Sequence, residues 1–344
     1  MDQPPLDNQT EFTAHPQLIL GKQGEMLLCM VKATFELVPG ELAPELASEE
    51  VARGIRFADV PWGEPEKSSV LYPSDVCLYK PGTDVVVAAA AHAPNGVPVP
   101  TFDTYVRVGP LTKTVRVFGL RVWESGGTGL SAPRPVTQVE MRYDNAWGGV
   151  DDTDPARFME EPRNPVGSGV ARDPNSLTHR IAPCLEDPEN PIKNARTRPP
   201  PAGIGPLGRH WAPRRQYLGT YDEVWKETRC PLPPEDEDDR LQLCASPGLF
   251  TEVPLRGGEE CAFLNLHPDG PVQFRLPMVP LEIEFRVKGR EPVVMRPHLD
   301  TVLVDLLYTS EEKPPVVELV WRASVKAPRR MKQSLTIVRE GQLS

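Results

Sequence analysis

The sequence lacks the segments that insert proteins into membranes or direct them to export. Its 344 residues contain no run of about 18 apolar residues, which is the length that a membrane helix needs. The first residues, MDQPPLDNQTEF, show no basic start followed by an apolar stretch, so we predict no secretory signal. The six cysteines are scattered along the chain, which favours reduced thiols. We therefore expect a cytoplasmic protein without membrane insertion.

The residue combinations that form common catalytic, metal and phosphate sites are missing as well. No two cysteines and no two histidines stand at the close spacing of a zinc site. The glycines of residues 126–129 lack the Lys-Ser or Lys-Thr that follows in a phosphate-binding loop. Ser168 stands between two glycines, but the Gly-x-Ser-x-Gly spacing of a nucleophile elbow is absent. We predict no catalytic residue, no metal site and no cofactor, and hence a protein that is not an enzyme.

Paired carboxylates leave one alternative open. Asp151 stands beside Asp152, and one residue separates Glu282 from Glu284. A glycosidase needs two carboxylates that face each other across a sugar. The first pair lies in a turn-like loop and the second on a strand face that is expected to be wet, so solvent exposure also explains both. A carbohydrate-binding or carbohydrate-active β protein is therefore kept as the alternative.

The net charge argues against nucleic acid as the partner. A formal charge of -10 at pH 7 leaves no excess of basic residues with which to release counterions from phosphates. The densest acidic block, residues 235–239, is expected to be a solvated loop. We expect no nucleic-acid partner.

Proline, by contrast, is abundant. The chain contains 41 prolines, about twice the usual frequency. Because proline has no backbone N–H and disrupts helix interiors, long helices should be scarce. Strands, turns and extended loops are expected instead.

Apolar and polar residues alternate in several segments, as they do in strands that have one buried face. The predicted strands comprise residues 25–38, 84–92, 112–123, 281–288, 302–306, 316–325 and 335–338. A short helix is expected at residues 43–52. We predict a mainly β fold. In it, two β-rich, sandwich- or barrel-like segments, 1–143 and 249–344, bracket a long loop insertion, 144–248, that has few short helices.

The insertion is rich in proline, glycine and tryptophan and shows no sustained periodicity. Loops of this length are rare in compact domains unless they are disordered or functional. Its aromatic side chains supply apolar area that can hold the loop against the β segments. We therefore predict an ordered insertion with a functional role.

Several phrases of the sequence resemble one protein family. They are YPSDVCLYKPGTDVVV from Tyr72, VGPLTKTVRVFGLRVW from Val108, NAWGG from Asn145, NPVGSG from Asn164 and PAGIGPLGRHWAPRRQYLGTYDEVW from Pro201. The phrases RCPLPPED from Arg229 and GGEECAFLNLHPDG from Gly257 continue in the same order. The chain resembles the DUF2169 family over nearly its whole length.

This resemblance implies a bacterial, cytoplasmic adaptor or chaperone of type VI secretion. Such a protein binds an effector that carries a PAAR or PAAR-like domain and helps to load it onto the VgrG spike, without enzymatic activity. A structural component of the secretion apparatus is a further alternative. The chain departs from the family pattern at Leu120, at residues 183–186 and in the acidic block 235–239. These departures bear on which effector it recognises.

Residues with the composition of interface hot spots are the candidates for protein binding, since Trp, Tyr and Arg are enriched there. They are Trp211, Arg214, Tyr221, Trp225, Trp147, Arg121 and Trp123. The alternative is that the aromatic side chains only fasten the insertion to the β segments. For Arg121 and Trp123, an internal contact of the arginine with an aromatic ring is favoured.

Seven further residues of the family pattern are predicted to be structural. They are Lys80, Asp84, Asn164, Pro165, Gly167, Gly205 and Gly219. Lys80 and Asp84 flank a Pro-Gly turn that an ion pair between them would close. Gly205 and Gly219 are expected where the backbone adopts a conformation closed to other residues.

Overall fold

Strands form most of the regular structure, and the two α-helices of the described chain are short. The computed structural model describes residues 4–38, 40–307, 314–327 and 334–341. Within these residues the strands assemble into several sheets, none of which closes into a barrel. The prediction of a mainly β fold is confirmed.

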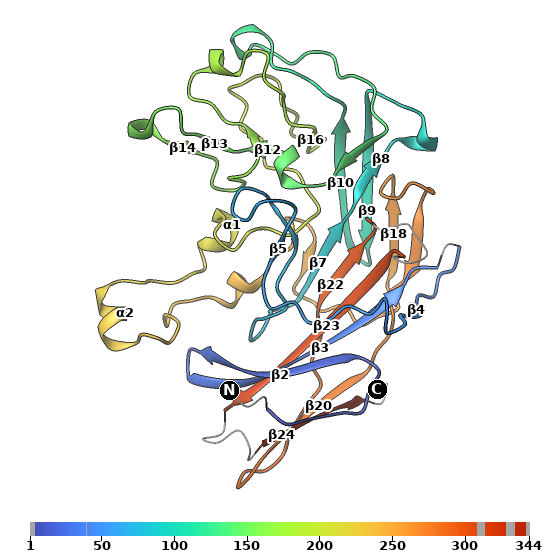
Figure 1. The fold of residues 1–344 in the computed structure, drawn as a ribbon, viewed down its shortest axis with the longest axis vertical. Coiled ribbons are helices and arrows are strands. Elements are labelled where there is room, and N and C mark those ends of the chain that lie inside the picture. Colours follow the sequence, from blue (N-terminus) through green and yellow to red (C-terminus); the bar gives the residue numbers. More distant parts are fainter. Residues whose placement is uncertain (1–3, 39, 308–313, 328–333, 342–344) are drawn as a thin grey trace.

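The largest sheet has seven strands and crosses the middle of the molecule (Figure 1). Its strands are β2 (Thr13–Gly21), β3 (Gly24–Glu36), β4 (Glu45–Leu46), β7 (Thr83–Ala88), β17 (Phe250–Thr251), β22 (Leu299–Asp305) and β23 (Val316–Lys326). Their order is β17-β7-β22-β23-β3-β2, and β4 pairs with β3. β7 and β22 are parallel, and the other neighbours are antiparallel.

The two faces of the seven-stranded sheet differ in polarity, because apolar and charged residues alternate along the strands. Val85, Val302 and Leu319 are register partners on one face and belong to the main hydrophobic core. Lys32 and Glu318 lie on the opposite face, where they are buried as well. One face of the sheet is thus apolar and the other is charged, and neither is open to solvent at these positions.

Smaller sheets surround this one. A five-stranded sheet has the order β16-β10-β9-β18-β19, and a four-stranded sheet has the order β1-β24-β20-β21. The first comprises β9 (Thr101–Val108), β10 (Leu111–Phe118), β16 (Leu185–Glu186), β18 (Glu260–Leu264) and β19 (Val272–Arg275). The second comprises β1 (Leu6–Asn8), β20 (Leu281–Val287), β21 (Val293–Met295) and β24 (Ser334–Glu340). Four strand pairs complete the set: β5 (Val60–Pro61) with β6 (Val70–Tyr72), β8 (Ala90–His92) with β11 (Gln138–Glu140), β12 (Trp147–Gly148) with β15 (Ser168–Gly169), and β13 (Val150–Asp151) with β14 (Met159–Glu160).

Strands from the two ends of the chain lie side by side. β3 pairs with β23, β9 with β18, and β1 with β24. In the central sheet of Figure 1 the red ribbon of β23 therefore lies beside the blue ribbon of β3. The expected β-rich segments 1–143 and 249–344 therefore contribute neighbouring strands to the same sheets and share one hydrophobic core.

The middle segment, residues 144–248, is described throughout and consists mainly of turns, short strands and 3₁₀-helices. It holds α1 (Ala212–Arg215) and α2 (Glu223–Thr228), neither of which is long or apolar enough to cross a membrane. The 3₁₀-helices of the described chain are η1 (Pro94–Gly96), η2 (Ser125–Gly127), η3 (Tyr143–Asn145), η4 (Pro155–Arg157), η5 (Pro174–Leu177) and η6 (Asp239–Gln242). A second small core, built around Trp123, Trp147 and Ile192, anchors the first half of this segment.

Most of the predicted strands are confirmed by β3, β7, β8, β10, β20, β22, β23 and β24. The short helix predicted at residues 43–52 is wrong, because this stretch contains β4 and turns. Its backbone pairs with β3, and the Ala47 amide donates a hydrogen bond to the Thr34 carbonyl at 3.0 Å. Pairing with a strand edge thus outweighs the local helix preference of a Glu-rich sequence.

The second core generates a prediction on stability. Trp147 is only 1% exposed, and its ring packs so closely on Gly169 that a Cβ there would lie 2.9 Å from the ring. Trp147→Ala should therefore lower the free energy of unfolding by about 3 to 5 kcal/mol. Urea denaturation followed by circular dichroism would measure this. Val224→Ala, at an exposed position of α2, is the control and should change stability by less than about 0.5 kcal/mol. Equal midpoints for the two variants would contradict the prediction.

Candidate functional site

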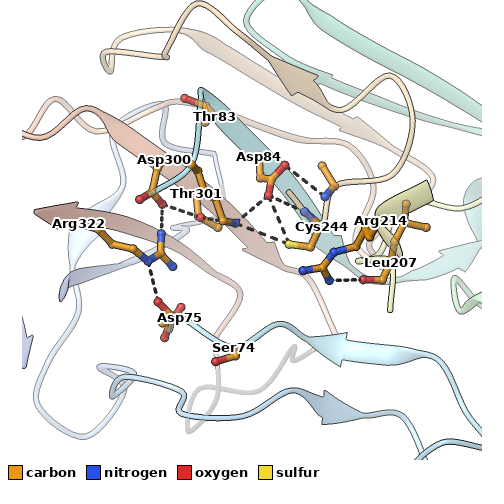
Figure 2. Close-up of polar contacts among 12 residues, drawn as sticks. Ser74, Asp75, Thr83, Asp84, Leu207, Arg214, Cys244, Asp300, Thr301 and Arg322 are labelled. Carbon is orange, nitrogen blue, oxygen red and sulfur yellow. Dashed lines mark hydrogen bonds and ion pairs between the residues drawn. The ribbon is translucent and has the colours of Figure 1, made fainter. Parts of the chain in front are cut away.

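A cluster of buried charged side chains occupies the polar face of the seven-stranded sheet. We call it the charge cluster; its members are Lys32, Arg56, Asp75, Lys80, Asp84, Asp300, Glu318 and Arg322. Figure 2 shows how part of it joins strands β7, β22 and β23 to the chain around Asp75 and Cys244. Because isolated charges are costly to bury, the pairing of these groups decides whether this face of the sheet can form.

One half of the charge cluster centres on the Lys80 ammonium. Its Nζ lies 2.7 Å from an Asp84 carboxylate oxygen and donates a hydrogen bond to Thr301 Oγ1 at 3.0 Å. The Cys244 amide donates to the same Asp84 carboxylate at 2.8 Å (Figure 2). The ion pair expected across the Pro-Gly turn is thus present, and it also reaches a strand and a loop distant in sequence.

The other half centres on two cations. Arg322 pairs with Asp300 and donates from Nε to the Asp75 carbonyl at 2.6 Å. Lys32 pairs with Asp75 and lies 3.2 Å from the Glu318 carboxylate. Thr301 Oγ1 donates to Asp300 at 2.8 Å and so connects the two halves.

Arg56 extends the charge cluster to the segment that covers this face. Its guanidinium donates to both carboxylate oxygens of Glu318, at 2.6 and 2.5 Å, and stacks over the Tyr72 ring at 4.6 Å. The Tyr72 hydroxyl donates to Asp305 at 2.6 Å. Residues 54–80 are therefore fastened to the sheet by charge as well as by packing.

The environment shifts the pKa values of these groups in a consistent way. Burial opposes ionisation of Glu318, but the charges of Lys32 and Arg56 hold the pKa of its carboxyl below the ordinary value. Burial likewise opposes the charged form of Lys80, yet the Asp84 carboxylate raises the pKa of its ammonium. Burial raises the pKa of the Cys244 thiol to about 12. Cys244 is therefore protonated at neutral pH, and a protonated thiol is a poor nucleophile.

A surface groove lies on the outer side of the stretch of chain that supplies Lys80 to the charge cluster. We call it the hairpin groove, since it follows the turn between β2 and β3; its volume is about 460 Å³. Ile19, Leu20 and Met26 come from the hairpin, while Leu78 and Tyr79 come from the motif that supplies Lys80. One stretch of chain thus directs its charges inward to the cluster and its apolar side chains outward to the groove.

The acidic block closes the hairpin groove from the other side. Lys22 Nζ donates to the Glu237 carbonyl, and Arg229 donates to the Lys22 carbonyl at 2.8 Å. Glu237 and Asp239 line the groove. Burial raises the pKa of the Glu237 carboxyl, although Arg209 and Lys22 act in the opposite direction. The block is therefore not a wholly solvated loop, because backbone contacts fasten it to the β2–β3 turn.

One predicted binding residue, Tyr221, lines this groove, and a second, Trp225, packs against Tyr221. Tyr221 is 49% exposed. Trp225 is half-buried in α2, where its ring contacts the Tyr221 ring edge-on at 4.6 Å and its Nε1 donates to the Leu232 carbonyl at 2.9 Å. Asp222 caps this helix by accepting a hydrogen bond from the Trp225 amide. A partner that binds the folded chain can reach this aromatic pair.

The other five candidates are buried and fasten the chain to itself. Trp123 and Trp147 lie in the second core, and Trp211 contacts the Tyr143 ring at 5.4 Å. The Arg214 guanidinium donates to the carbonyls of Leu207 and Leu241. Arg121 pairs with Glu186 and lies over the Phe118 ring at 3.7 Å, so its aromatic contact is with Phe118 and not with Trp123. No surface patch can be formed from these five residues in this conformation.

The structural residues of the family pattern have distinct surroundings. Asn164 is buried and donates from its side chain to the carbonyls of Tyr143 and Trp147 at 2.8 and 2.9 Å. Pro165 follows it and is half-buried, and a Cβ on Gly167 would lie 2.4 Å from the Asn164 amide nitrogen. The backbone at Gly167 lies too close to Asn164 to leave room for a Cβ, which explains the glycine at this position.

The two remaining glycines, Gly205 and Gly219, differ in backbone conformation. Gly219 has a φ of 79°, which disfavours residues with a side chain, as expected. Gly205 does not lie in this left-handed region, and a Cβ there would meet only the Val87 carbonyl at 3.9 Å. The expectation of a special backbone conformation is therefore wrong for Gly205.

Several residues of the charge cluster and the groove were not identified from the sequence. Lys32, Glu318 and Arg322 each interrupt an apolar strand, a pattern that indicates buried ion pairs when several such strands share a sheet. Leu20 and Tyr79 carry no such signal, because an exposed apolar residue is common on any surface.

Comparisons with known proteins give one match. A family model described as an uncharacterized protein conserved in bacteria, DUF2169, matches residues 22–322. No curated protein and no solved structure matches the chain. The matched range includes the hairpin turn, the charge cluster and the middle segment.

The charge cluster predicts a large difference between buried and exposed ion pairs. Lys80→Met leaves Asp84 buried without its cation, so the free energy of unfolding should fall by about 3 to 5 kcal/mol. The matched control is Arg116→Met, which breaks a pair with Asp103 whose side chains are 40% and 42% exposed. This change should cost less than about 1 kcal/mol. Chemical denaturation of both variants would test this, and equal losses would refute the assigned importance of Lys80.

The lowered pKa of Glu318 predicts a dependence on pH. Its folded pKa lies below the unfolded value of about 4.3, so ionised Glu318 contributes stability above that pH. This contribution is lost as the pH falls through the folded pKa. Glu318→Gln should therefore be less stable than the original chain at pH 7, and the difference should shrink below about pH 4. Denaturation curves at several pH values would measure it; a constant difference would contradict the role of the ionised carboxylate.

Proposed function

The chain belongs to the DUF2169 family of bacterial proteins, and we propose that it is a non-enzymatic, cytoplasmic adaptor or chaperone. Its proposed partner is an effector with a PAAR or PAAR-like domain, which it helps to load onto the VgrG spike of a type VI secretion system. A role of this kind requires a rigid surface that can bind a folded protein or cover its exposed apolar segments.

The hairpin groove is the observation that carries this proposal. Leu20, Tyr79 and Tyr221 are 40%, 48% and 49% exposed, and all three line it. Exposed aromatic and apolar side chains around a concave surface are typical of the centre of a protein interface. Most of the groove, including Tyr79 and Tyr221, lies within the part of the chain that matches the family, whereas Leu20 precedes it.

Rigidity of the groove supports the same proposal. The β2–β3 turn is held to the acidic block through Lys22 and Arg229, and Tyr79 adjoins Lys80 of the charge cluster. A surface that is already ordered loses less conformational entropy when a partner binds. The chain can therefore present these side chains without first folding around its partner.

One observation favours the alternative of a carbohydrate-binding or carbohydrate-active protein. Glu237 and Asp239 both line the hairpin groove, and burial raises the pKa of Glu237, as in many sugar-cleaving acids. Trp123 and Trp147 are buried, however, and cannot form a platform for a sugar ring. Calorimetric titration with oligosaccharides would favour this alternative if it detected binding that Glu237→Gln abolished.

The adaptor proposal predicts a complex that depends on the groove. The protein should co-purify with a PAAR-domain effector encoded beside its gene and should raise the soluble level of that effector. Tyr221→Ala should weaken the complex about tenfold or more, because a central aromatic side chain often contributes 2 kcal/mol or more. Phe158→Ala is the matched control, since this aromatic residue is exposed but lies outside the groove.

Stability must be measured with affinity. Replacement of the buried Trp211 by alanine should destabilise the fold. Tyr221→Ala should leave the unfolding midpoint close to that of the original chain. Lack of binding between the original chain and a correctly folded effector would count against the adaptor role. Isolation of the protein as a stable part of secreted spikes would instead favour a structural component.

A further inference from the structure

The β21 strand has an unusual exposure for an edge strand. It stands at the end of the four-stranded sheet and pairs only with β20 among the described strands. Val293 and Val294 are adjacent, so they point to opposite faces of the sheet, and yet they are 44% and 50% exposed. Proteins usually protect such edges with short length, charge or a covering loop, because a free apolar edge accepts another strand. β21 has only three residues, but its two exposed valines are apolar, and no described strand covers its outer edge.

Each face of β21 offers a different surface. Val293 and Met295 are register partners of Phe285 and Ile283, so this face continues the main hydrophobic core outward. Val294 is the partner of Glu284 and lies on a face of arginines and glutamates. An added strand could bury apolar side chains on the first face and place polar ones beside the second.

The glutamates of this second face already have partners. Arg339 lies 2.9 Å from Glu284 and 3.2 Å from Glu282, and Arg296 lies 2.7 Å from Glu282. Glu284 is consequently buried, although simple alternation predicts a wet face at this position. The carboxylates on this face therefore leave little unpaired negative charge next to β21.

Cations at the β20–β21 turn and at the adjoining end of β23 have no such pairing among the described residues. Lys288 and Lys326 form no ion pair with the described residues, and among these residues the Arg290 guanidinium donates only to the Lys326 carbonyl, at 3.1 Å. All three are exposed. The three cations outnumber the exposed Glu291 of the same turn, so in a chain with a net charge of -10 they give the edge a local preference for carboxylates.

A groove continues from the other end of β21. Its volume is about 510 Å³, and Met278, Pro280, Leu281, Arg296 and Pro297 are among its lining residues. None of its lining residues belongs to the hairpin groove. A segment that follows the edge of β21 would thus pass from the cationic turn into an apolar cleft.

We propose that β21 is a docking strand for an extended protein segment in which apolar side chains alternate with carboxylates. The segment pairs with β21 and becomes the fifth strand of this sheet. Main-chain hydrogen bonds provide affinity in this mode, while alternate side chains provide specificity. The inference stands apart from the adaptor proposal, because it concerns another surface and a partner defined by chemistry alone.

A blocked peptide with a fluorescent label tests the proposal directly. The probe is acetyl-Glu-Val-Glu-Val-Glu-Val-amide, and the comparison peptide has lysine in place of each glutamate. Fluorescence anisotropy with the full chain should show tighter binding of the acidic peptide by about tenfold or more. Hydrogen exchange should slow within residues 293–295 when that peptide binds, because the backbone N–H groups on the open edge of β21 become paired.

Matched variants test whether the peptide binds at β21. Val293→Asp with Val294→Asp should weaken binding of the acidic peptide at least tenfold, through lost apolar contact and repulsion. The control is Val97→Asp with Val224→Asp, which makes the same change at two exposed valines elsewhere and should leave affinity unchanged. Lys288→Gln with Arg290→Gln should weaken binding and reduce its dependence on salt.

Three results would overturn the proposal. They are equal affinity for the two peptides, equal affinity of the two aspartate variants, and exchange that does not slow at β21. Self-association of the chain that the β21 variant abolishes would assign this edge to a second copy instead. Each of these results leaves the effector complex unaffected, so failure here is distinguishable from failure of the adaptor role.

Discussion

Pairing of charges beneath the central sheet is the constraint on which the rest of the structure depends. The charge cluster has four cations, Lys32, Arg56, Lys80 and Arg322, and four carboxylates, Asp75, Asp84, Asp300 and Glu318, and all but the partly exposed Arg56 are buried. Because removal of one partner leaves a charge without compensation in a medium of low polarity, the group is stable only when complete. Residues 54–80, strands β3, β7, β22 and β23 and the loop at Cys244 must all be in place together, and the hairpin groove lies on this base.

Local patterns in the sequence are sufficient for part of this description. The strands follow from alternation, and the Lys80–Asp84 pair follows from its position around a turn. The partners of β3 do not follow, since β23 lies far away in sequence and alternation does not say which strands meet. The helix wrongly predicted at residues 43–52 has the same cause. Pairing with the edge of β3, and not local preference, decides the conformation of this stretch.

Two aromatic residues show more clearly that composition does not predict which side chains are exposed. Trp211 and Tyr221 are ten positions apart in one loop-rich segment and belong to the same class of residue. Trp211 is buried against Tyr143, whereas Tyr221 is displayed at the groove beside Trp225. Only the path of the chain separates them, so a sequence can predict that such a segment is ordered but not which of its rings meets solvent. The middle segment thus uses most of its aromatic area for stability and exposes a small part of it.

The pairing of β3 with β23 has a consequence for how the protein is made in the cell. β3 ends at Glu36, and its long partner begins only at Val316. At about 5 to 20 residues per second, a ribosome needs about 15 to 60 seconds to span that interval. For most of this time the apolar β3 strand is outside the ribosome, while β23, its neighbour on one side in the finished sheet, does not yet exist. The central sheet is therefore completed only after β23 has been made, and until then the nascent chain depends on other contacts or on cellular folding factors to keep β3 from wrong partners.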